Sequence, residues 1–282
     1  INKTNLSSAG GGGIRSGDGY PKIFNNVIMN NKGRYGAGIV LNYCSATLSN
    51  NIVVENVGGE DYGGGGIWIN DIKEFPNVLI NNTILSNKSV SDGGGILIYS
   101  SSAAQIINNI VFNNIDNTNS QISLRGGANA EVTYCDIEGG YPVVGNFNLS
   151  PSFLDSSFYL NNDSPCIDAG DANIQFNDLE NPNQPGNALW PSMGTLRNDV
   201  GAYGGPSSSI LVDFSIPSLY IPSSEYDFGL TYPNEPVEIF IPIINNGGSV
   251  LFIDSVTTMN NEISIQNSFP LSINPILKDS LV

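Results

Sequence analysis

The sequence predicts an all-β protein in which a parallel β-helix precedes a smaller antiparallel β-sandwich. A glycine-rich motif recurs through the first half of the chain, and the glycine before its isoleucine stands at positions 13, 38, 66 and 95. Residues 210–282 instead alternate apolar and polar side chains. The chain is also rich in asparagine and contains 32 glycines, and both residue types favour turns over helices.

The repeated unit begins with the glycine motif. Steps of 25, 28 and 29 residues separate the successive glycines, and a period of about 20 to 50 residues indicates stacked units that cannot bury their apolar faces alone. The copies are Gly36–Leu41, Gly64–Ile69 and Gly93–Ile98, with a looser copy at Gly11–Ser16. An asparagine pair follows each copy, at Asn25–Asn26, Asn50–Asn51, Asn81–Asn82 and Asn108–Asn109.

Each unit reads as three short strands, with no window long enough for a helix. The first strand is the Gly-Ile motif, the second runs into the asparagine pair, and the third follows it. Such a unit forms one coil of a parallel β-helix, in which equivalent strands pair at roughly 4.8 Å from coil to coil. Equal positions then stack, so the repeated asparagines can form a hydrogen-bonded amide ladder and adopt left-handed backbone angles.

Four motifs follow one another in residues 148–205. They are Pro151-Ser152-Phe153-Leu154-Asp155, Phe158-Tyr159-Leu160, Ser164-Pro165-Cys166-Ile167-Asp168-Ala169-Gly170 and Asp199-Val200-Gly201-Ala202-Tyr203-Gly204-Gly205. With them, residues 1–140 resemble the bacterial right-handed parallel β-helix proteins of the pectate-lyase-like superfamily, and residues 148–205 resemble the closing segment of its secreted members. The resemblance implies a secreted, single-stranded right-handed β-helix over residues 1–205. It fixes no activity, because the superfamily includes lyases, hydrolases, epimerases and adhesins.

The composition changes after a linker at residues 206–209. Residues 210–282 show the alternation of an antiparallel sandwich, with Ile239, Ile241 and Ile243 on one face. The order Asp227-Phe228-Gly229, Ile244-Asn245-Asn246-Gly247 and Leu251-Phe252-Ile253 resembles the Ig-like ASH domain, which is related to major sperm protein. Because such a sandwich needs about 100 residues, we expect a truncated Ig-like domain. Its unpaired edge predicts self-association by strand addition.

Composition excludes several classes of function. A net charge of −16 argues against binding nucleic acid or anionic lipid through charge. The absence of histidine excludes Ser-His-Asp and Cys-His catalysis and His-ligated zinc. Three cysteines do not support a disulfide framework. No stretch approaches 18 apolar residues, so the sequence predicts no transmembrane segment.

A candidate glycan site lies on the first strand of each coil. If Ile14, Ile39, Ile67 and Ile96 point inward, then Arg15, Val40, Trp68 and Leu97 form one outward column. An outward Trp68 can stack on a sugar ring, with Arg15 two coils away to hold a hydroxyl or carboxylate. The alternative interpretation is that a loop covers Trp68.

Candidate catalytic carboxylates are few. Asp18 and Asp71 share a turn column two coils apart, roughly 9.6 Å at 4.8 Å per coil, which lies at the edge of the spacing for an inverting glycosidase pair. Asp at a turn is also ordinary, so both residues can be turn formers. Asp136 and Glu138 place two carboxylates on one strand face, which a solvated turn explains equally well.

The third strand of each coil is apolar on both faces. Val27, Ile52 and Ile110 should face outward if Ile28 and its equivalents face inward. A strand that is apolar on both faces is buried on both sides, so a loop, the second domain or another chain should cover this sheet. Packing in another register is the alternative.

The closing segment suggests a calcium site. The stretch from Asp155 to Asp199 is long, polar and irregular, and a long loop needs something to hold it. Its oxygen-bearing side chains have few basic partners, and a divalent cation would relieve their mutual repulsion. The predicted Ca²⁺ ligands are Asp168, Asp171, Asn173, Asp178 and Asp199.

These observations favour a secreted or cell-surface scaffold that binds a polysaccharide or cell-surface glycan, with the Ig-like domain as spacer or anchor. The alternative is a polysaccharide lyase or glycoside hydrolase of the same fold. The scarcity of basic residues and the absence of a carboxylate cluster favour the scaffold.

Overall fold

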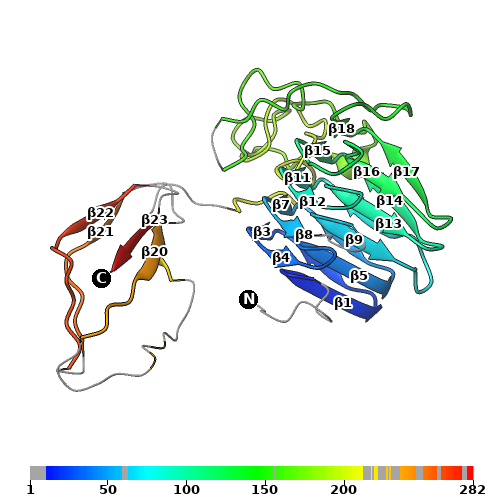
Figure 1. The fold of residues 1–282 in the computed structure, drawn as a ribbon. Coiled ribbons are helices and arrows are strands. Elements are labelled where there is room, and N and C mark those ends of the chain that lie inside the picture. The colour runs from blue at the N-terminus through cyan, green and yellow to red at the C-terminus, as the bar shows by residue number, and fades with distance from the viewer. Residues whose placement is uncertain are drawn as a thin grey trace. The chain divides into compact units, whose positions relative to one another are not determined.

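The computed structural model divides the chain into two compact units, Ile1–Leu211 and Val212–Val282. In the first unit it describes residues 11–58, 63–154 and 157–211 (Figure 1). In the second it describes residues 217, 219–221, 227, 229, 236–245, 250–258, 262–274 and 278–281.

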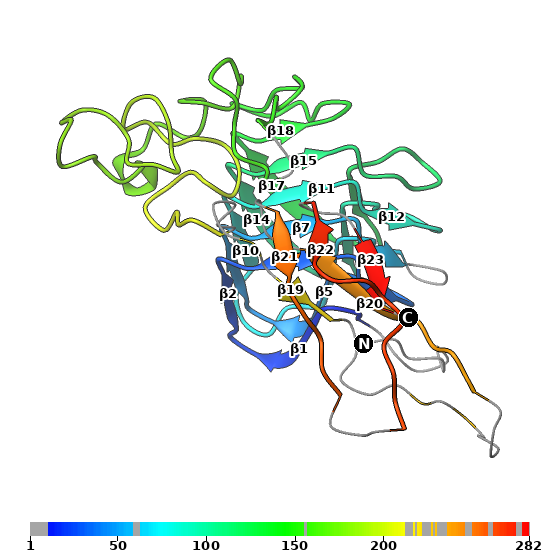
Figure 2. The same cartoon turned by 90° about the vertical axis from the view of Figure 1, so that its left-hand side faces the viewer.

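The first unit is a parallel β-helix, as the repeat predicts. Its coils stack so that equivalent strands pair in parallel register (Figures 1 and 2). Sheet A contains β1 (Ile14–Gly19), β5 (Ile39–Cys44), β9 (Ile67–Asn70), β13 (Ile96–Tyr99) and β16 (Ile122–Leu124). Sheet B contains β2 (Lys22–Phe24), β6 (Thr47–Ser49), β10 (Asn77–Ile80), β14 (Ala103–Ile107) and β17 (Asn129–Thr133).

Sheet C runs through all five coils, and sheet D through three of them. Sheet C contains β3 (Val27–Met29), β7 (Ile52–Val54), β11 (Thr83–Leu85), β15 (Ile110–Phe112) and β18 (Asp136–Ile137). Sheet D is smaller and contains β4 (Lys32–Gly33), β8 (Val57–Gly58) and β12 (Lys88–Ser89). The core lies between the sheets. Ile39, Ile67 and Ile96 are fully buried there, and Ile14 packs against them partly exposed.

The second residue of each asparagine pair points inward and forms the predicted amide ladder. The side-chain Nδ2 of Asn26 donates to Oδ1 of Asn51 at 3.0 Å, and the same bond joins Asn51 to Asn82 and Asn82 to Asn109, each at 2.9 Å. The ladder ends where the backbone N–H of Asn109 donates to the thiol of Cys135. Cys135 is free, as are Cys44 and Cys166, and all three are buried.

A second ladder, which we did not predict, stands five residues further along each coil. Its bonds join Asn31 to Asn56, Asn56 to Asn87, and Asn87 to Asn114, each at 2.9 Å. Asn114 donates in turn to Oε1 of Gln121 at 2.8 Å. All of these side chains donate in the same direction, toward the C-terminal coils, so each bond polarises the next.

The first residue of each asparagine pair has left-handed backbone angles, with φ of 54° at Asn25, 55° at Asn50, 51° at Asn81 and 57° at Asn108. Asparagine tolerates these angles better than most residues with a Cβ. The first three of these side chains bond residues 198–208, which we call the strap. Asn25 donates to the carbonyl of Ser207, and Asn50 to those of Ala202 and Gly204.

The strap covers the middle strands of sheet C, which are buried on both faces, whereas Met29 of β3 stays 38% exposed. Ile52 and Ile110, which point away from the core, are fully buried. Above them, the backbone N–H of Ala202 donates to Oγ1 of Thr83 at 2.9 Å. A Cβ at Gly201, where φ is +106°, would lie 2.6 Å from Cδ1 of Ile110, so the close approach of strap and sheet requires glycine there. The cover is a segment of the same unit.

The predicted linker at residues 206–209 lies against the β-helix. Ser208 is buried, and its hydroxyl lies 3.1 Å from that of Ser192. The segment that closes the β-helix also contains a short 3-10 helix, η1 (Ile174–Phe176).

The second unit is antiparallel. β20 (Ile241–Asn245) pairs with β19 (Leu219–Tyr220) and β23 (Lys278–Leu281), while β21 (Leu251–Ile253) pairs with β22 (Leu271–Ile273). Ile243 is buried, and Ile239 and Ile241 are partly buried, in keeping with the predicted face. Several residues of the predicted Ig-like motifs, including Phe228 and Asn246-Gly247, lie outside the described residues.

Candidate functional site

The structure places Trp68 and Arg15 in the predicted column, because Arg15 pairs with Val40 and Val40 with Trp68. Arg15 is exposed, but Trp68 is only 8% exposed. The ring of Tyr35, from the connection between β4 and β5, lies over Trp68 at a centroid distance of 4.8 Å. The structure therefore shows the alternative arrangement, in which a loop residue covers Trp68. Sugar binding at Trp68 stays a prediction, and it requires Tyr35 to move.

Asp18 and Asp71 occupy equivalent turn positions, with φ of 53° and 55°, and Tyr43 stands between them in the intervening coil with φ of 55°. Asp18 accepts a hydrogen bond from the Lys73 ammonium at 2.7 Å. This bond and the positive charge of Lys73 lower the pKa of Asp18. A carboxyl group with a lowered pKa is a poor proton donor in catalysis. It is better suited to accept hydrogen bonds from a ligand as a carboxylate.

A loop at the same corner, where sheet A turns into sheet B, carries Phe75 and bonds to residues of the first two coils. The hydroxyl of Ser45 accepts hydrogen bonds from the backbone N–H groups of Glu74 and Phe75 and donates to the carbonyl of Phe75. Tyr20 donates to Glu74 at 2.6 Å, and the ammonium of Lys73 lies 5.4 Å from the centre of the Tyr20 ring. These bonds fix the loop against the two coils below it.

Tyr20, Tyr43 and Phe75 are exposed residues, at 54%, 53% and 58%. We call Asp18, Tyr20, Tyr43, Lys73 and Phe75 the corner site. Sequence reasoning found only Asp18 there. The sequence could have indicated Tyr43, because it lies midway between Asp18 and Asp71 in the turn column. No local sequence pattern indicated that residues 72–76 fold back toward the first coil.

The five predicted calcium ligands lie in the closing segment, where hydrogen bonds engage them. Asp168 accepts from the N–H and hydroxyl of Thr195 at 2.9 and 2.7 Å. Asp171 accepts from the N–H of Asn173, and Asn173 caps η1 through the N–H of Gln175. In the part of the chain that the structure describes, no group of three or more acidic or cysteine side chains is placed to hold a metal ion. Calcium therefore stays a prediction, and Asp155 lies outside the described residues.

Asp178 and Asp199 are buried and face strap and closing-segment backbone. Asp199 accepts from the N–H groups of Asp168 and Met193 at 2.8 and 2.7 Å, and Asp178 accepts from the N–H of Asp199. Burial is the main cause that raises the pKa of Asp178 to about 8 and that of Asp199 to about 7, and the negative charge of Asp199 raises the pKa of Asp178 further. Burial likewise raises the pKa of Asp136 to about 6.

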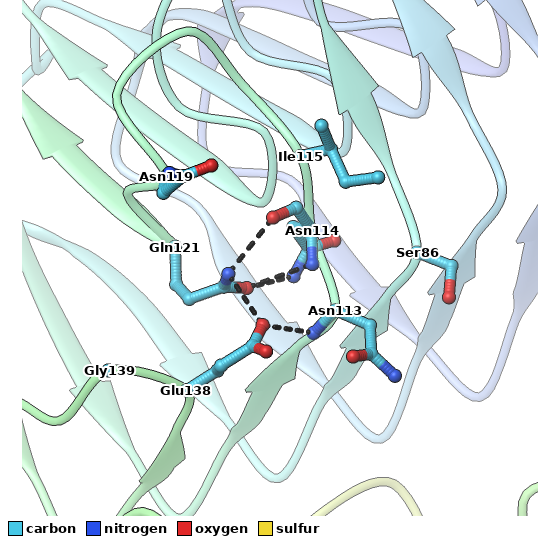
Figure 3. A pocket seen from close by; sticks show the side chains of 8 residues that line it. All are labelled: Ser86, Asn113, Asn114, Ile115, Asn119, Gln121, Glu138 and Gly139. Atoms are coloured by element: carbon cyan, nitrogen blue, oxygen red, sulfur yellow. Dashed lines mark hydrogen bonds between the residues drawn. The ribbon is translucent and has the colours of Figure 1, made fainter.

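A hollow of about 560 Å³ lies where the second ladder ends (Figure 3). Gln121 Nε2 donates to Oε2 of Glu138 at 3.0 Å, and the backbone N–H of Asn113 donates to the same oxygen at 2.8 Å. The ladder thus ends on a carboxylate, which is the preferred partner for the donor end of aligned amides. The residues around the hollow are Ser86, Asn113, Asn114, Ile115, Asn119, Gln121, Glu138 and Gly139.

The fold defines the class of protein: a β-helix repeat protein of about five coils with a small antiparallel unit after it. The chain matches no protein-family model, and comparison with curated proteins and with solved structures finds no match. In the described part of the chain, no helix has the length and apolarity that crossing a membrane requires.

Proposed function

We propose that this protein is a secreted or cell-surface β-helix scaffold that binds a neutral glycan at the corner site. The observation that carries the proposal is that three exposed aromatic residues, Tyr20, Tyr43 and Phe75, stand at the corner that also holds the Asp18–Lys73 ion pair. The motifs of residues 148–205, which resemble the closing segment of secreted pectate-lyase-like proteins, support the location. The Ig-like resemblance of residues 210–282 supports a role for the second unit as spacer or anchor.

The chemistry of the corner site matches a sugar. Aromatic faces cover the apolar C–H face of a pyranose, while the carboxylate and ammonium can bond hydroxyl groups. A net charge of −16 repels polyanions, so a neutral glycan suits the protein better than a uronate. Because three coils supply the corner site, with Tyr20 from the first, Tyr43 from the second and Phe75 from the third, an extended chain fits it better than a single sugar.

The test is retention on a panel of immobilised neutral plant and algal polysaccharides, with the supernatant assayed for reducing and unsaturated ends. Tyr43→Asn removes one ring and keeps a residue that tolerates the left-handed angles. Loss of a stacking contact worth about 0.5–1.5 kcal/mol predicts roughly two- to tenfold weaker retention.

Tyr134→Asn is the control for backbone conformation, because Tyr134 also has left-handed angles, with φ of 54°, on another corner of the β-helix, where its ring is partly buried beside Gly145. The wild-type protein should be retained without product release, and only Tyr43→Asn should weaken retention. Equal retention of the two variants would remove the corner site from the proposal. Release of sugar ends would replace the scaffold with the lyase or hydrolase alternative.

A further inference from the structure

The hollow at the end of the second ladder has a rigid wall. Asn114 and Gln121 are 4% and 5% exposed, and their amides bond each other and the neighbouring coils. The hydrogen bond from Gln121 fixes the Glu138 carboxylate in turn. In Figure 3 this carboxylate lies between Gln121 and the backbone of Asn113. The wall is therefore formed before any ligand arrives, which reduces the entropy lost on binding.

Other polar groups around the hollow retain free hydrogen-bonding capacity. The Ser86 hydroxyl, the Asn113 and Asn119 side-chain amides and Oε1 of Glu138 make no hydrogen bond to the residues that the structure describes. They supply both donors and acceptors, and Ile115 adds an apolar surface beside them. A volume of about 560 Å³ lies within the range of small-molecule sites.

We infer that this hollow binds one end of a neutral oligosaccharide. Mixed donors and acceptors suit hydroxyl groups, which both donate and accept. The only acidic or basic side chain among the residues that surround the hollow is that of Glu138, so the site disfavours uronates and other anions. The inference shares its ligand class with the proposed function, but none of the surrounding residues belongs to the corner site.

The test follows backbone amide resonances of the full chain while cellobiose, laminaribiose, mannobiose and digalacturonate are added separately. At least one neutral disaccharide should shift the resonances of residues 113–121, 138 and 139, while digalacturonate should shift them less. Asn113→Gly and Asn119→Gly remove side-chain amides at left-handed positions, with φ of 54° and 56°, where glycine fits. Each should weaken the binding at least threefold.

Asn30→Gly is the matched control, because Asn30 is exposed and has left-handed angles at the equivalent turn of the first coil, outside the hollow. Binding by Asn30→Gly should equal that of the wild type. The inference fails if no neutral disaccharide shifts these resonances at 20 mM, roughly the weakest affinity of interest, or if all three variants bind alike. Tyr43→Asn should leave these shifts unchanged, so failure of the corner site and failure of the hollow are distinguishable.

Discussion

Asn81 donates its side-chain amide to the carbonyl oxygen of Asp199 at 2.8 Å, joining the third coil to a strap residue 118 positions later. The same amide also lies 3.2 Å from the carbonyl of Gly201. Asn25 and Asn50 bond the strap in the same way from the two coils before. One column of left-handed asparagines therefore holds the strap, a run of turns in the protein's own backbone, against sheet C.

Asn81→Gly tests this attachment. Glycine keeps the left-handed angles, but buried strap carbonyls lose their donor, which costs about 1–3 kcal/mol. Chemical denaturation should show this loss, and proteolysis within residues 157–205 should accelerate. Asn25→Gly, which removes a single exposed bond to Ser207, should change the free energy of unfolding by much less. An equal effect of both variants would contradict the role of the buried contact.

Asn82→Asp tests the first ladder. Asn82 is fully buried and donates to Oδ1 of Asn109, whereas a carboxylate at this position would face that oxygen without a proton to share. We expect a loss of more than about 2 kcal/mol in unfolding free energy. Asn26→Asp, at the open end of the same ladder, should cost less because its side chain is only partly buried. Similar midpoints for the two variants would argue against a continuous ladder.

Trp68→Ala separates the covered indole from a sugar platform. Trp68 packs against Val40, Leu97 and Tyr35, and truncation of a buried aromatic residue costs about 3–5 kcal/mol. We expect a lower thermal midpoint and unchanged glycan retention below that midpoint. A variant with wild-type stability that no longer retains glycan would restore Trp68 as the binding platform.

The buried acids predict that mild acid stabilises the closing segment. The pKa values of Asp136, Asp199 and Asp178 are raised from 3.8 to about 6, 7 and 8. A raised pKa in the folded state means that the stabilising contribution is complete below about pH 4 and is lost as the pH rises through 6 to 8. The thermal midpoint should therefore fall between pH 5 and pH 9.

Asp178→Asn should flatten this pH dependence, because the amide carries no charge at any pH in the range. Asp163→Asn is the control, since Asp163 is an exposed residue of the same segment. A midpoint that rises with pH in the wild-type protein would contradict the prediction.

Calcium binding can be tested by thermal unfolding, since the predicted ligands already accept hydrogen bonds from the protein. A bound ion should raise the thermal midpoint with calcium concentration in the millimolar range, and Asp168→Ala should remove the response. If these carboxylates only accept hydrogen bonds from N–H and hydroxyl groups, the thermal midpoint should be the same in calcium and in chelator. That second result, in protein shown to be metal-free, would leave the acids as hydrogen-bond acceptors alone.

Several features followed from the sequence alone. The isoleucine after each glycine motif and the second asparagine of each pair recur at one point of each of the first four coils, and in-register parallel stacking places equal residues on equal residues. Strand order, the inward isoleucine column and the first amide ladder follow from this rule. The second ladder obeyed the same rule at Asn31, Asn56, Asn87 and Asn114, and its signal was the constant spacing of five residues from the first ladder.

Only the tertiary structure decided which outward columns are covered. Thr83 and Ile110 of sheet C lie under a strap more than 90 residues further along the chain, Trp68 lies under Tyr35, and Tyr43 stays exposed. Periodicity specifies which face a residue takes within a coil, because that depends on local backbone geometry. Which segment packs on that face depends on the paths of the loops between coils. These loops differ in length and sequence, so the repeat does not predict their paths. The sequence therefore determined the β-helix, and the irregular segments determined which parts of its surface stay exposed.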